Sequence, residues 1–218
     1  MFRIVTIERE YGCGGGAIAQ KLSEQLGWNL WDHRLTEEIA GMANVDCSAV
    51  ERRGEKLDSR FYRLAKTFWR GSYERAIPLD VRQTFDADCM VAMMESICAK
   101  IAVEGRAVVV GRGAPYFLRD RDDTFHIFLY APRAEKIRRI MADGQSQEAA
   151  EELVDTVDSE RKAFIRHYFN SDWPTRALYH MMINTAMGND HVIATIRETM
   201  LRLENRRDLS PAGLRGIR

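Results

Sequence analysis

The first residues of the chain place a glycine cluster directly between a strand pattern and a helix pattern, in FRIVTIEREYGCGGGAIAQKLSEQLG. Arg3 to Ile7 is short and rich in β-branched residues, which favours a strand. Ile18, Leu22 and Leu26 then recur at helical spacing. The N–H groups and the dipole at a helix N-terminus attract anions, and glycines let the backbone come close to them. The arrangement therefore predicts a phosphate-binding loop.

This loop departs from the common nucleotide-binding pattern G-x-x-x-x-G-K-[ST], in which the lysine binds the outer phosphates and the hydroxyl binds magnesium. If Gly14 is the second glycine, Arg9 stands at the first glycine, Gly15 at the lysine and Gly16 at the hydroxyl. Only the backbone part of the pattern is retained. Arg9 is our hypothesis for the missing positive charge, because a guanidinium binds phosphate oxygens bidentately and stays charged at any working pH.

Two alternatives remain for the glycine cluster. Gly12, Gly14 and Ala17 also fit the dinucleotide fingerprint G-x-G-x-x-G/A, with Asp32 about twenty residues further on. Against this, Arg9 to Tyr11 separate the strand from the first glycine, and the next clear strand pattern after Asp32 lies only near Ala107. The second alternative is a glycine-rich turn that binds no ligand.

Composition excludes several classes of protein. The 218 residues include 32 basic and 32 acidic side chains, a balance that creates no field favouring nucleic acid. No apolar run is long enough to span a bilayer, and the N-terminus opens into a strand pattern rather than a signal sequence, so we expect a cytoplasmic protein. The four cysteines are scattered without C-x-x-C spacing, so neither a disulfide framework nor a zinc site is indicated.

Strand and helix patterns alternate along the chain. The strand patterns lie at Arg3–Glu8, Trp28–Asp32, Ala107–Gly111, Phe125–Tyr130 and Tyr179–Asn184. Such alternation predicts a mainly parallel sheet covered by helices on both faces, with ligands bound at the carboxyl ends of the strands. The segments 9–16, 32–34, 111–113 and 131–133 follow strand ends and are therefore the expected site.

We expect one domain over residues 1–205, with a helical arm inserted at 43–100 and a flexible tail at 206–218. The tail contains Pro211, Gly213 and Gly216. Within the arm, the aromatic segment Phe61–Tyr73 has apolar residues at helical spacing, and it is expected to pack on the core or against a second copy in a homodimer.

Arginines supply the candidate catalytic charges. Arg112 follows the third strand in VVVGRGAPYFL and is the first candidate for a substrate contact. APRAEKIRRIM carries Arg139, and DSERKAFIRHYF carries Arg161 and Arg166. Phosphoryl transfer spreads negative charge over equatorial oxygens, which arginines from a closing segment stabilise. The ordinary alternative is a surface arginine paired with an acid.

These segments together resemble the cytidylate-kinase-like family of P-loop proteins. TIEREYGCGGGAIAQKL is similar to the family's R-E-x-G-S-G-G-x-x-I-A loop with Cys13 in place of serine, and VVVGRGAPYFL to its G-R-G segment. IFLYAPRAEKIRRI resembles its fourth strand and lid entry, and YHMMINT its last strand. The resemblance implies an α/β, P-loop nucleoside monophosphate kinase-like fold of three layers, built on a five-stranded parallel sheet. It also implies a helical insertion and a lid at 133–170.

The resemblance also implies an activity, the transfer of the γ-phosphate of ATP to CMP or dCMP with magnesium. Arg9 and the loop residues are then expected to hold the donor phosphates, and Asp32 and Arg112 to face the acceptor. Arg139, Arg161 and Arg166 resemble lid arginines that neutralise the transferred group. The loop residues expected to bind the nucleotide are Gly12, Cys13, Gly14, Gly15, Gly16 and Ala17.

Departures from the family leave the function open between two classes. Gly15 and Gly16 replace the lysine and hydroxyl, and Val110 stands where an aspartate precedes the third-strand glycine. Magnesium loses two usual anchors, and no metal-ligating residue is assigned, although magnesium often binds through substrate phosphates. A phosphotransferase acting on a small nucleotide is one class. A non-catalytic nucleotide-binding sensor or interaction protein with a degenerate loop is the other.

Overall fold

The computed structural model describes residues 1–32, 34–35 and 87–208. Most of the expected helical arm, including the aromatic segment at 61–73, lies outside the described residues. The described part contains the strands β1 (Ile4–Arg9), β2 (Asn29–Trp31), β3 (Ala107–Val110), β4 (Thr124–Tyr130) and β5 (Met181–Asn184). Each strand lies where the sequence predicts one, and its ends coincide with the predicted ends or differ from them by one or two residues.

The five strands form one parallel sheet in the order β2-β3-β1-β4-β5. β1 lies at the centre, where Ile4 pairs with Ala107 of β3 on one side and with Thr124 of β4 on the other. All six residues of β1 are buried, which suits its β-branched sequence. Because the strands are parallel, the loop after β1 shares its edge of the sheet with Asp32, Gly111, Ala131 and Thr185.

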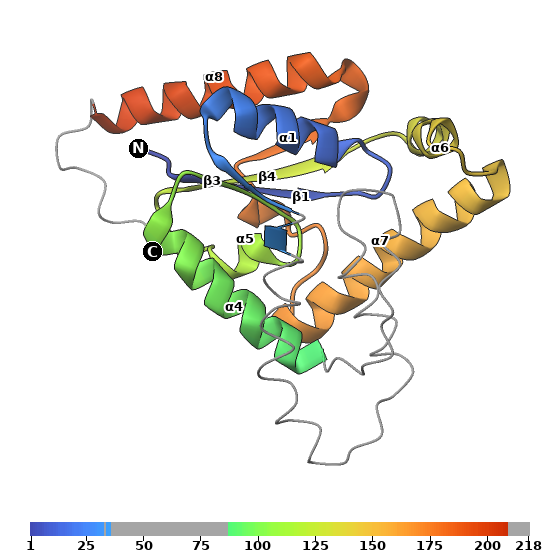
Figure 1. Ribbon diagram of the computed structural model, residues 1–218, viewed down its shortest axis with the longest axis horizontal. Coiled ribbons are helices and arrows are strands. Elements are labelled where there is room, and N and C mark those ends of the chain that lie inside the picture. Colours follow the sequence, from blue (N-terminus) through green and yellow to red (C-terminus); the bar gives the residue numbers. More distant parts are fainter. Residues whose placement is uncertain (33, 36–86, 209–218) are drawn as a thin grey trace, which may run out of the picture.

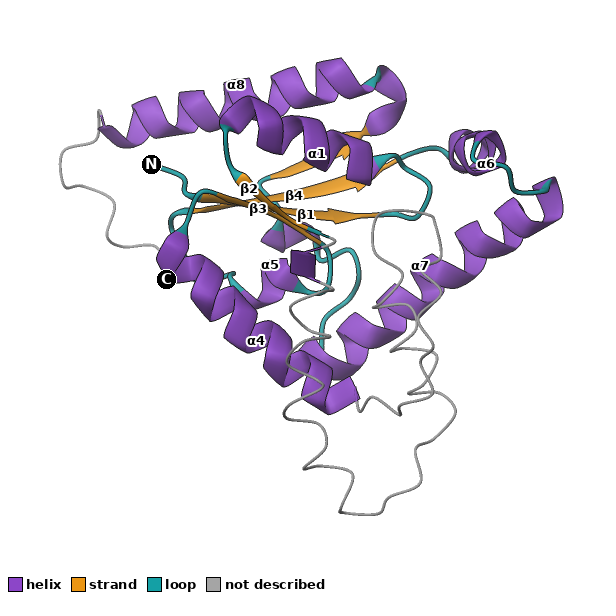
Figure 2. Cartoon of the chain, viewed as in Figure 1, coloured by secondary structure: helices purple, strands orange, loops and turns teal. Residues whose placement is uncertain are grey.

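Helices cover both faces of the sheet (Figures 1 and 2). The helical elements among the described residues are α1 (Gly15–Leu26), α4 (Ala87–Glu104), α5 (Ala114–Phe117), α6 (Arg133–Ala142), α7 (Gln147–Phe169), η3 (Arg176–Leu178), η4 (Thr185–Met187) and α8 (Asn189–Asp208). α1 and α8 pack on one face, where Ile18 and Ile196 join a core with Val5 and Ile7 of β1. This three-layer architecture confirms the predicted α/β fold.

The opposite face is covered by α4, α5 and α7 (Figure 1). There, Met94 and Ile97 of α4 and Phe164 of α7 surround Ile4 in a second core. A third, smaller cluster joins Tyr11 of the loop to α6 and α7. The loop after β1 is therefore packed against the pair α6 and α7, the region expected to act as a lid.

The described helices include none that is both long enough and apolar enough to cross a membrane. α8 continues to Asp208, so the first three residues of the segment expected to form a flexible tail are helical. Residues 209–218 lie outside the described part of the chain.

Candidate functional site

The loop after β1 adopts the backbone conformation that its glycines predict. Gly12 and Gly14 have φ values of +73° and +79°, in the left-handed region, and Gly14 is the N-cap of α1. A glycine adopts this conformation without the steric cost that a Cβ would add. The chain can therefore turn from β1 into α1 within a few residues, which leaves the first turn of the helix facing the sheet edge.

The loop presents main-chain N–H groups without needing a side chain. Within the described residues the N–H groups of Gly14, Gly16 and Ala17 have no protein acceptor. Gly14 and Gly16 are half-buried and Ala17 is exposed. Such a set of N–H groups at a helix N-terminus is suited to bind an anion.

Arg9 lies beneath this loop and is only 6% exposed. A Cβ placed on Gly15, the position of the missing lysine, would lie 3.0 Å from Arg9 Cγ, and one placed on Gly111 would lie 1.7 Å from Arg9 Nη1. The Arg9 side chain therefore crosses from β1 to the end of β3 through space that the absence of side chains at both glycines leaves open. The sequence predicted a positive charge here, but not its burial.

Glu8 is the nearest counter-ion of Arg9 in the described part of the chain, with Oε1 3.7 Å from Arg9 Nη1 and 3% exposure. Burial raises the pKa of the Glu8 carboxyl, and Arg9 opposes that rise. Burial likewise lowers the pKa of Arg9, followed by repulsion from Arg161, with Glu8 acting in the opposite direction. Glu8 and Arg9 thus form a buried ion pair at the end of β1.

Arg112 and Asp32 meet at the edge formed by β2 and β3. Arg112 has a φ of +57° and is 7% exposed, and its Nη1 donates a 2.9 Å hydrogen bond to the main-chain oxygen of Asp32. Burial lowers the pKa of Arg112 to about 10, against the attraction of Asp32. Arg112 is therefore buried rather than at the surface, and the two residues expected to face the acceptor lie in contact.

Helix α7 contacts the start of the loop through Asp158 and Arg161. Asp158 Oδ1 accepts the N–H of Tyr11 at 2.8 Å, and Arg161 Nη1 donates to the carbonyl of Arg9 at 2.9 Å and to Asp158 at 3.1 Å. Lys136 of α6 completes the cluster by donating to Glu10 at 2.9 Å. α6 and α7 are thus joined to the loop by charged groups that are mostly buried.

Arg139 lies on the other side of the loop and acts differently from a lid arginine that reaches over a phosphate. Its Nη1 donates to the carbonyl of Cys13 and, at 2.9 Å, to Thr185 Oγ1, while Nη2 donates to Thr185 O at 3.1 Å. Its Nε binds Glu135 at 2.8 Å. Thr185 Oγ1 also donates to Cys13 O at 2.6 Å. In this arrangement Arg139 links the loop after β1 to the end of β5 through hydrogen bonds.

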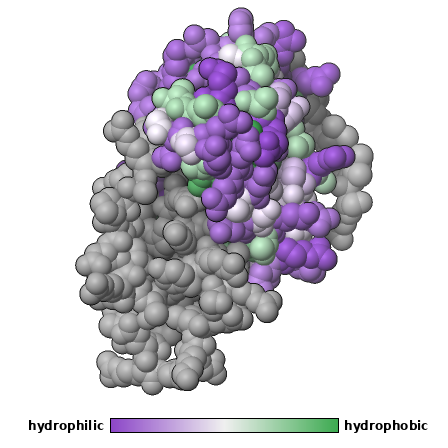
Figure 3. Space-filling model, turned by 90° about the vertical axis from the view of Figure 1, so that its right-hand side faces the viewer, coloured by the Kyte–Doolittle hydropathy of each residue, from purple (hydrophilic) through white to green (hydrophobic). Residues whose placement is uncertain are grey.

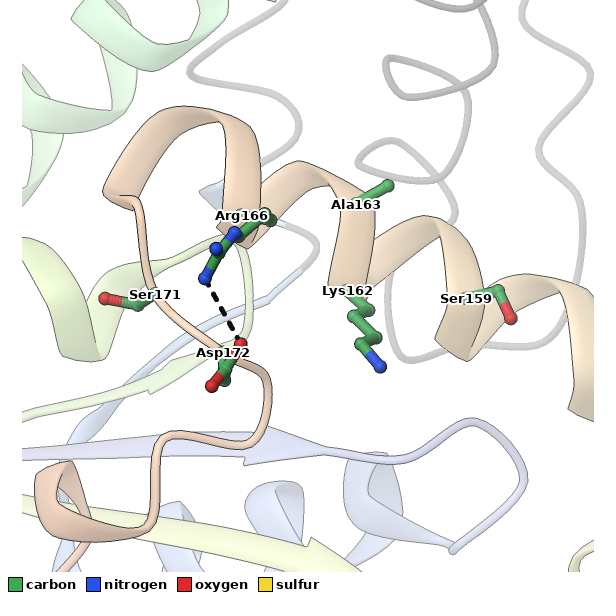
Figure 4. Close-up of a pocket in the computed structure, with 6 residues that line it drawn as sticks. All are labelled: Ser159, Lys162, Ala163, Arg166, Ser171 and Asp172. Carbon is green, nitrogen blue, oxygen red and sulfur yellow. Dashed lines mark hydrogen bonds and ion pairs between the residues drawn. The ribbon is translucent and has the colours of Figure 1, made fainter.

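Arg166 is the one candidate arginine that lies apart from the loop. It is exposed and pairs with Asp172 at 3.3 Å. Figure 4 shows it on α7 at a pocket of about 330 Å³. The structure therefore brings Arg9, Arg139 and Arg161 to the loop and places Arg112 at the neighbouring strand end, whereas Arg166 belongs to a separate hollow.

Four residues that contact the loop or each other at the site were not identified from the sequence. They are Lys136, its partner Glu10, Asp158 and Thr185. Thr185 follows β5 directly, so the strand-end rule used for the other strands would have found it. Asp158 and Arg161 are three residues apart on one helix, a spacing that places both on the same face.

The described residues include no group of three or more His, Cys, Asp or Glu side chains that could hold a metal ion. Gly16 offers no hydroxyl, and Val110 is fully buried in β3. Neither position therefore offers the magnesium ligand that the family pattern places there. Cys13 is a buried thiol whose pKa burial raises to about 11, which agrees with a structural loop residue.

Comparisons with known proteins agree with this architecture. Residues 4–187 match the model of the cytidylate kinase-like family. An uncharacterized protein from Eubacterium ventriosum has a similar structure, with a TM-score of 0.61 and 24% identity over 91% of this chain and 99% of that one. Shikimate kinase from Bacteroides thetaiotaomicron is similar at a TM-score of 0.52 and 12% identity, over 90% and 97% of the two chains. No curated protein matches. At these identities the solved structures support the fold alone.

Proposed function

The chain belongs to the cytidylate kinase-like family, and we propose that it transfers a phosphoryl group from ATP to a nucleoside monophosphate, with CMP and dCMP as the first acceptors to test. The observation that carries the proposal is the loop itself, where free N–H groups at the start of α1 lie beside the buried guanidinium of Arg9. These two features together offer donors and charge to the phosphates of a nucleotide.

In this proposal each group has a defined role in the reaction. The N–H groups of Gly14, Gly16 and Ala17 hold donor phosphate oxygens, and Arg9 supplies the charge that a loop lysine supplies elsewhere. Arg112 binds the acceptor. An acceptor phosphate oxygen attacks the γ-phosphorus, the bond to the bridging oxygen breaks, and ADP leaves. Fixed arginines in a site that excludes water stabilise the charge on the equatorial oxygens.

The test is a direct assay of ADP release with ATP, magnesium and a panel of acceptors that includes CMP, dCMP, UMP, AMP and cytidine. We expect turnover with a pyrimidine monophosphate and none with the neutral nucleoside. Arg112→Ala is expected to raise the KM of the acceptor more than that of ATP. Release of ADP from no acceptor, by a protein that demonstrably binds ATP, contradicts the proposal.

A second candidate, a nucleotide-binding sensor without catalysis, is favoured by one specific observation. Arg9, Arg161, Lys136 and Arg139 each already bind a carboxylate of the chain. A loop whose cations are held by the protein's own acids can bind a nucleotide without having charge to spare for a transition state. Calorimetric binding of ATP combined with absent turnover selects this candidate.

A further inference from the structure

A second hollow lies on α7, outside the loop site. Its volume is about 330 Å³, at the lower end of the range for small-molecule sites. The described residues that line it are Ser159, Lys162, Ala163, Arg166, Ser171 and Asp172. None of these belongs to the loop after β1. In Figure 4 the side chains of Lys162 and Arg166 leave the same side of α7, with Asp172 close to the guanidinium.

Lys162 differs from the other arginines and lysines of α6 and α7. Each of those side chains forms an ion pair with a carboxylate: Arg133 with Asp155, Lys136 with Glu10, Arg138 and Arg139 with Glu135, Arg161 with Asp158, and Arg166 with Asp172. Lys162 forms no hydrogen bond or ion pair with any described residue, and it lines the pocket. An ammonium directed into a cavity without a carboxylate partner is available to an external anion.

The second cation of the pocket is only weakly held. Arg166 Nη1 lies 3.3 Å from Asp172 Oδ1, and the two side chains are 64% and 85% exposed. Exposed pairs of this kind contribute little to stability. A phosphate oxygen makes shorter and stronger charge-assisted hydrogen bonds with a guanidinium than this geometry provides. An entering phosphate group would therefore compete effectively with Asp172.

The remaining polar groups are hydrogen-bond acceptors. Ser159 Oγ donates to the carbonyl of Asp155 at 2.8 Å, and Ser171 Oγ donates to the carbonyl of Phe169 at 3.0 Å. In Figure 4 the hydroxyls of Ser159 and Ser171 point away from Lys162 and Arg166, so the acceptor beside these two cations is the Asp172 carboxylate. A carboxylate complements a hydroxyl group of a ligand rather than its anion.

From this pattern we propose that the pocket binds a small phosphate ester that carries neighbouring hydroxyl groups, with Lys162 and Arg166 on the phosphate and Asp172 on a hydroxyl. Such a group is either the sugar phosphate of the acceptor or part of a separate metabolite. Only the first of these sources rests on the proposed kinase function, because the site itself is defined by its own charges.

The experiment is a calorimetric titration of the full-length protein with ribose 5-phosphate, inorganic phosphate and ribose as probes. Lys162→Ala is the test variant and Lys162→Arg is the conservative variant. Lys21→Ala is the control, since Lys21 is another exposed lysine, lies on α1 away from the pocket and pairs with Asp190. We expect ribose 5-phosphate to bind more tightly than either other probe. We expect Lys162→Ala to weaken it about tenfold, on the scale of one charge-assisted hydrogen bond, while Lys162→Arg and Lys21→Ala leave it unchanged.

Equal affinity of the wild type and Lys162→Ala for ribose 5-phosphate overturns the proposal, as does absence of binding to the wild type. Where binding is lost in Lys162→Ala, a competition experiment identifies the source. Exclusion of the probe by CMP assigns the pocket to the acceptor, and simultaneous binding assigns it to a separate metabolite. Because binding is measured without turnover, an inactive protein that still binds the probe contradicts the kinase proposal alone.

Discussion

Gly111→Ala tests whether Arg9 contributes to ATP binding at the loop after β1. Gly111 has a φ of +67°, and a Cβ there would lie 1.7 Å from Arg9 Nη1 and 2.8 Å from its Cζ. No methyl group fits at that distance, so the guanidinium has to leave its place. If Arg9 holds a donor phosphate, its displacement removes a charged hydrogen bond worth about 1.5–3 kcal/mol. This corresponds to roughly 10- to 100-fold weaker ATP binding.

The chain contains a matched control for the backbone strain. Gly27, the C-cap of α1, has a φ of +64°, and a Cβ there would meet nothing within 4 Å. Gly27→Ala and Gly111→Ala both place alanine in the left-handed region, which costs about 1–2 kcal/mol of unfolding free energy. Only the second variant also displaces Arg9, so only it is expected to weaken ATP binding.

The assay is calorimetric titration of ATP against the wild type, both glycine variants, Arg9→Ala and the double variant Gly111→Ala with Arg9→Ala. If Gly111→Ala acts through Arg9, it causes no further loss of affinity once Arg9 is absent, a non-additivity expected of groups in contact. ATP affinity that is equal in Gly111→Ala and Gly27→Ala refutes the reasoning, because the guanidinium would then have moved without consequence.

Three further predictions follow from buried or hydrogen-bonded side chains of the loop and the sheet. Arg139→Ala is expected to destabilise the fold by about 1.5–3 kcal/mol in urea unfolding, since it removes charged hydrogen bonds to the loop and β5, whereas Arg138→Ala, an exposed neighbour on the same helix, leaves the urea midpoint nearly unchanged. Cys13, whose pKa is raised to about 11 by burial, is expected to resist iodoacetamide at about pH 8 until the protein is unfolded; rapid native labelling in a peptide map contradicts its burial. Burial lowers the pKa of His126 from 6.5 to about 4, so the native state binds fewer protons than the unfolded one between these values, and stability should fall by at most about 3 kcal/mol on acidification; a urea midpoint that falls as much in His126→Gln as in the wild type contradicts this.

The strands were predictable because each is a short, buried and β-rich run between polar segments. Ala107–Val110 and Thr124–Tyr130 are examples, and all four residues of the first and all but the last of the second are buried. The phosphate loop was predictable for a related reason, since left-handed glycines between a strand and a helix allow few other conformations. The parallel order then placed the strand-end residues on one edge.

The partners of the charged residues were not predictable from sequence position. Arg139 and Arg166 look alike as helix arginines, yet one binds Cys13 O and Thr185 and the other lies at an exposed pocket. The difference depends on the direction of α6 and α7 relative to the sheet, which no local pattern encodes. The burial of Arg9 likewise depends on Gly111, a residue about a hundred positions away that β-sheet pairing brings beside it.

The pairing of charges around the loop sets a condition on how a nucleotide binds. Its cations are matched by carboxylates, Arg9 by Glu8, Arg161 by Asp158, and Lys136 by Glu10. A triphosphate that binds here adds negative charge, but the cations that would balance this charge are already paired with carboxylates. Either the α7 carboxylate Asp158 gives up its place to a phosphate oxygen, or magnesium arrives with the nucleotide and offsets the added charge. Asp158 accepts the N–H of Tyr11 at the start of the loop, so the first route also frees that donor for the phosphate.

On this argument Asp158→Asn, which keeps a hydrogen-bond acceptor but removes the charge, should strengthen ATP binding most in the absence of magnesium. Titrations with and without magnesium measure that difference, and an equal effect in both rules out exchange at Asp158.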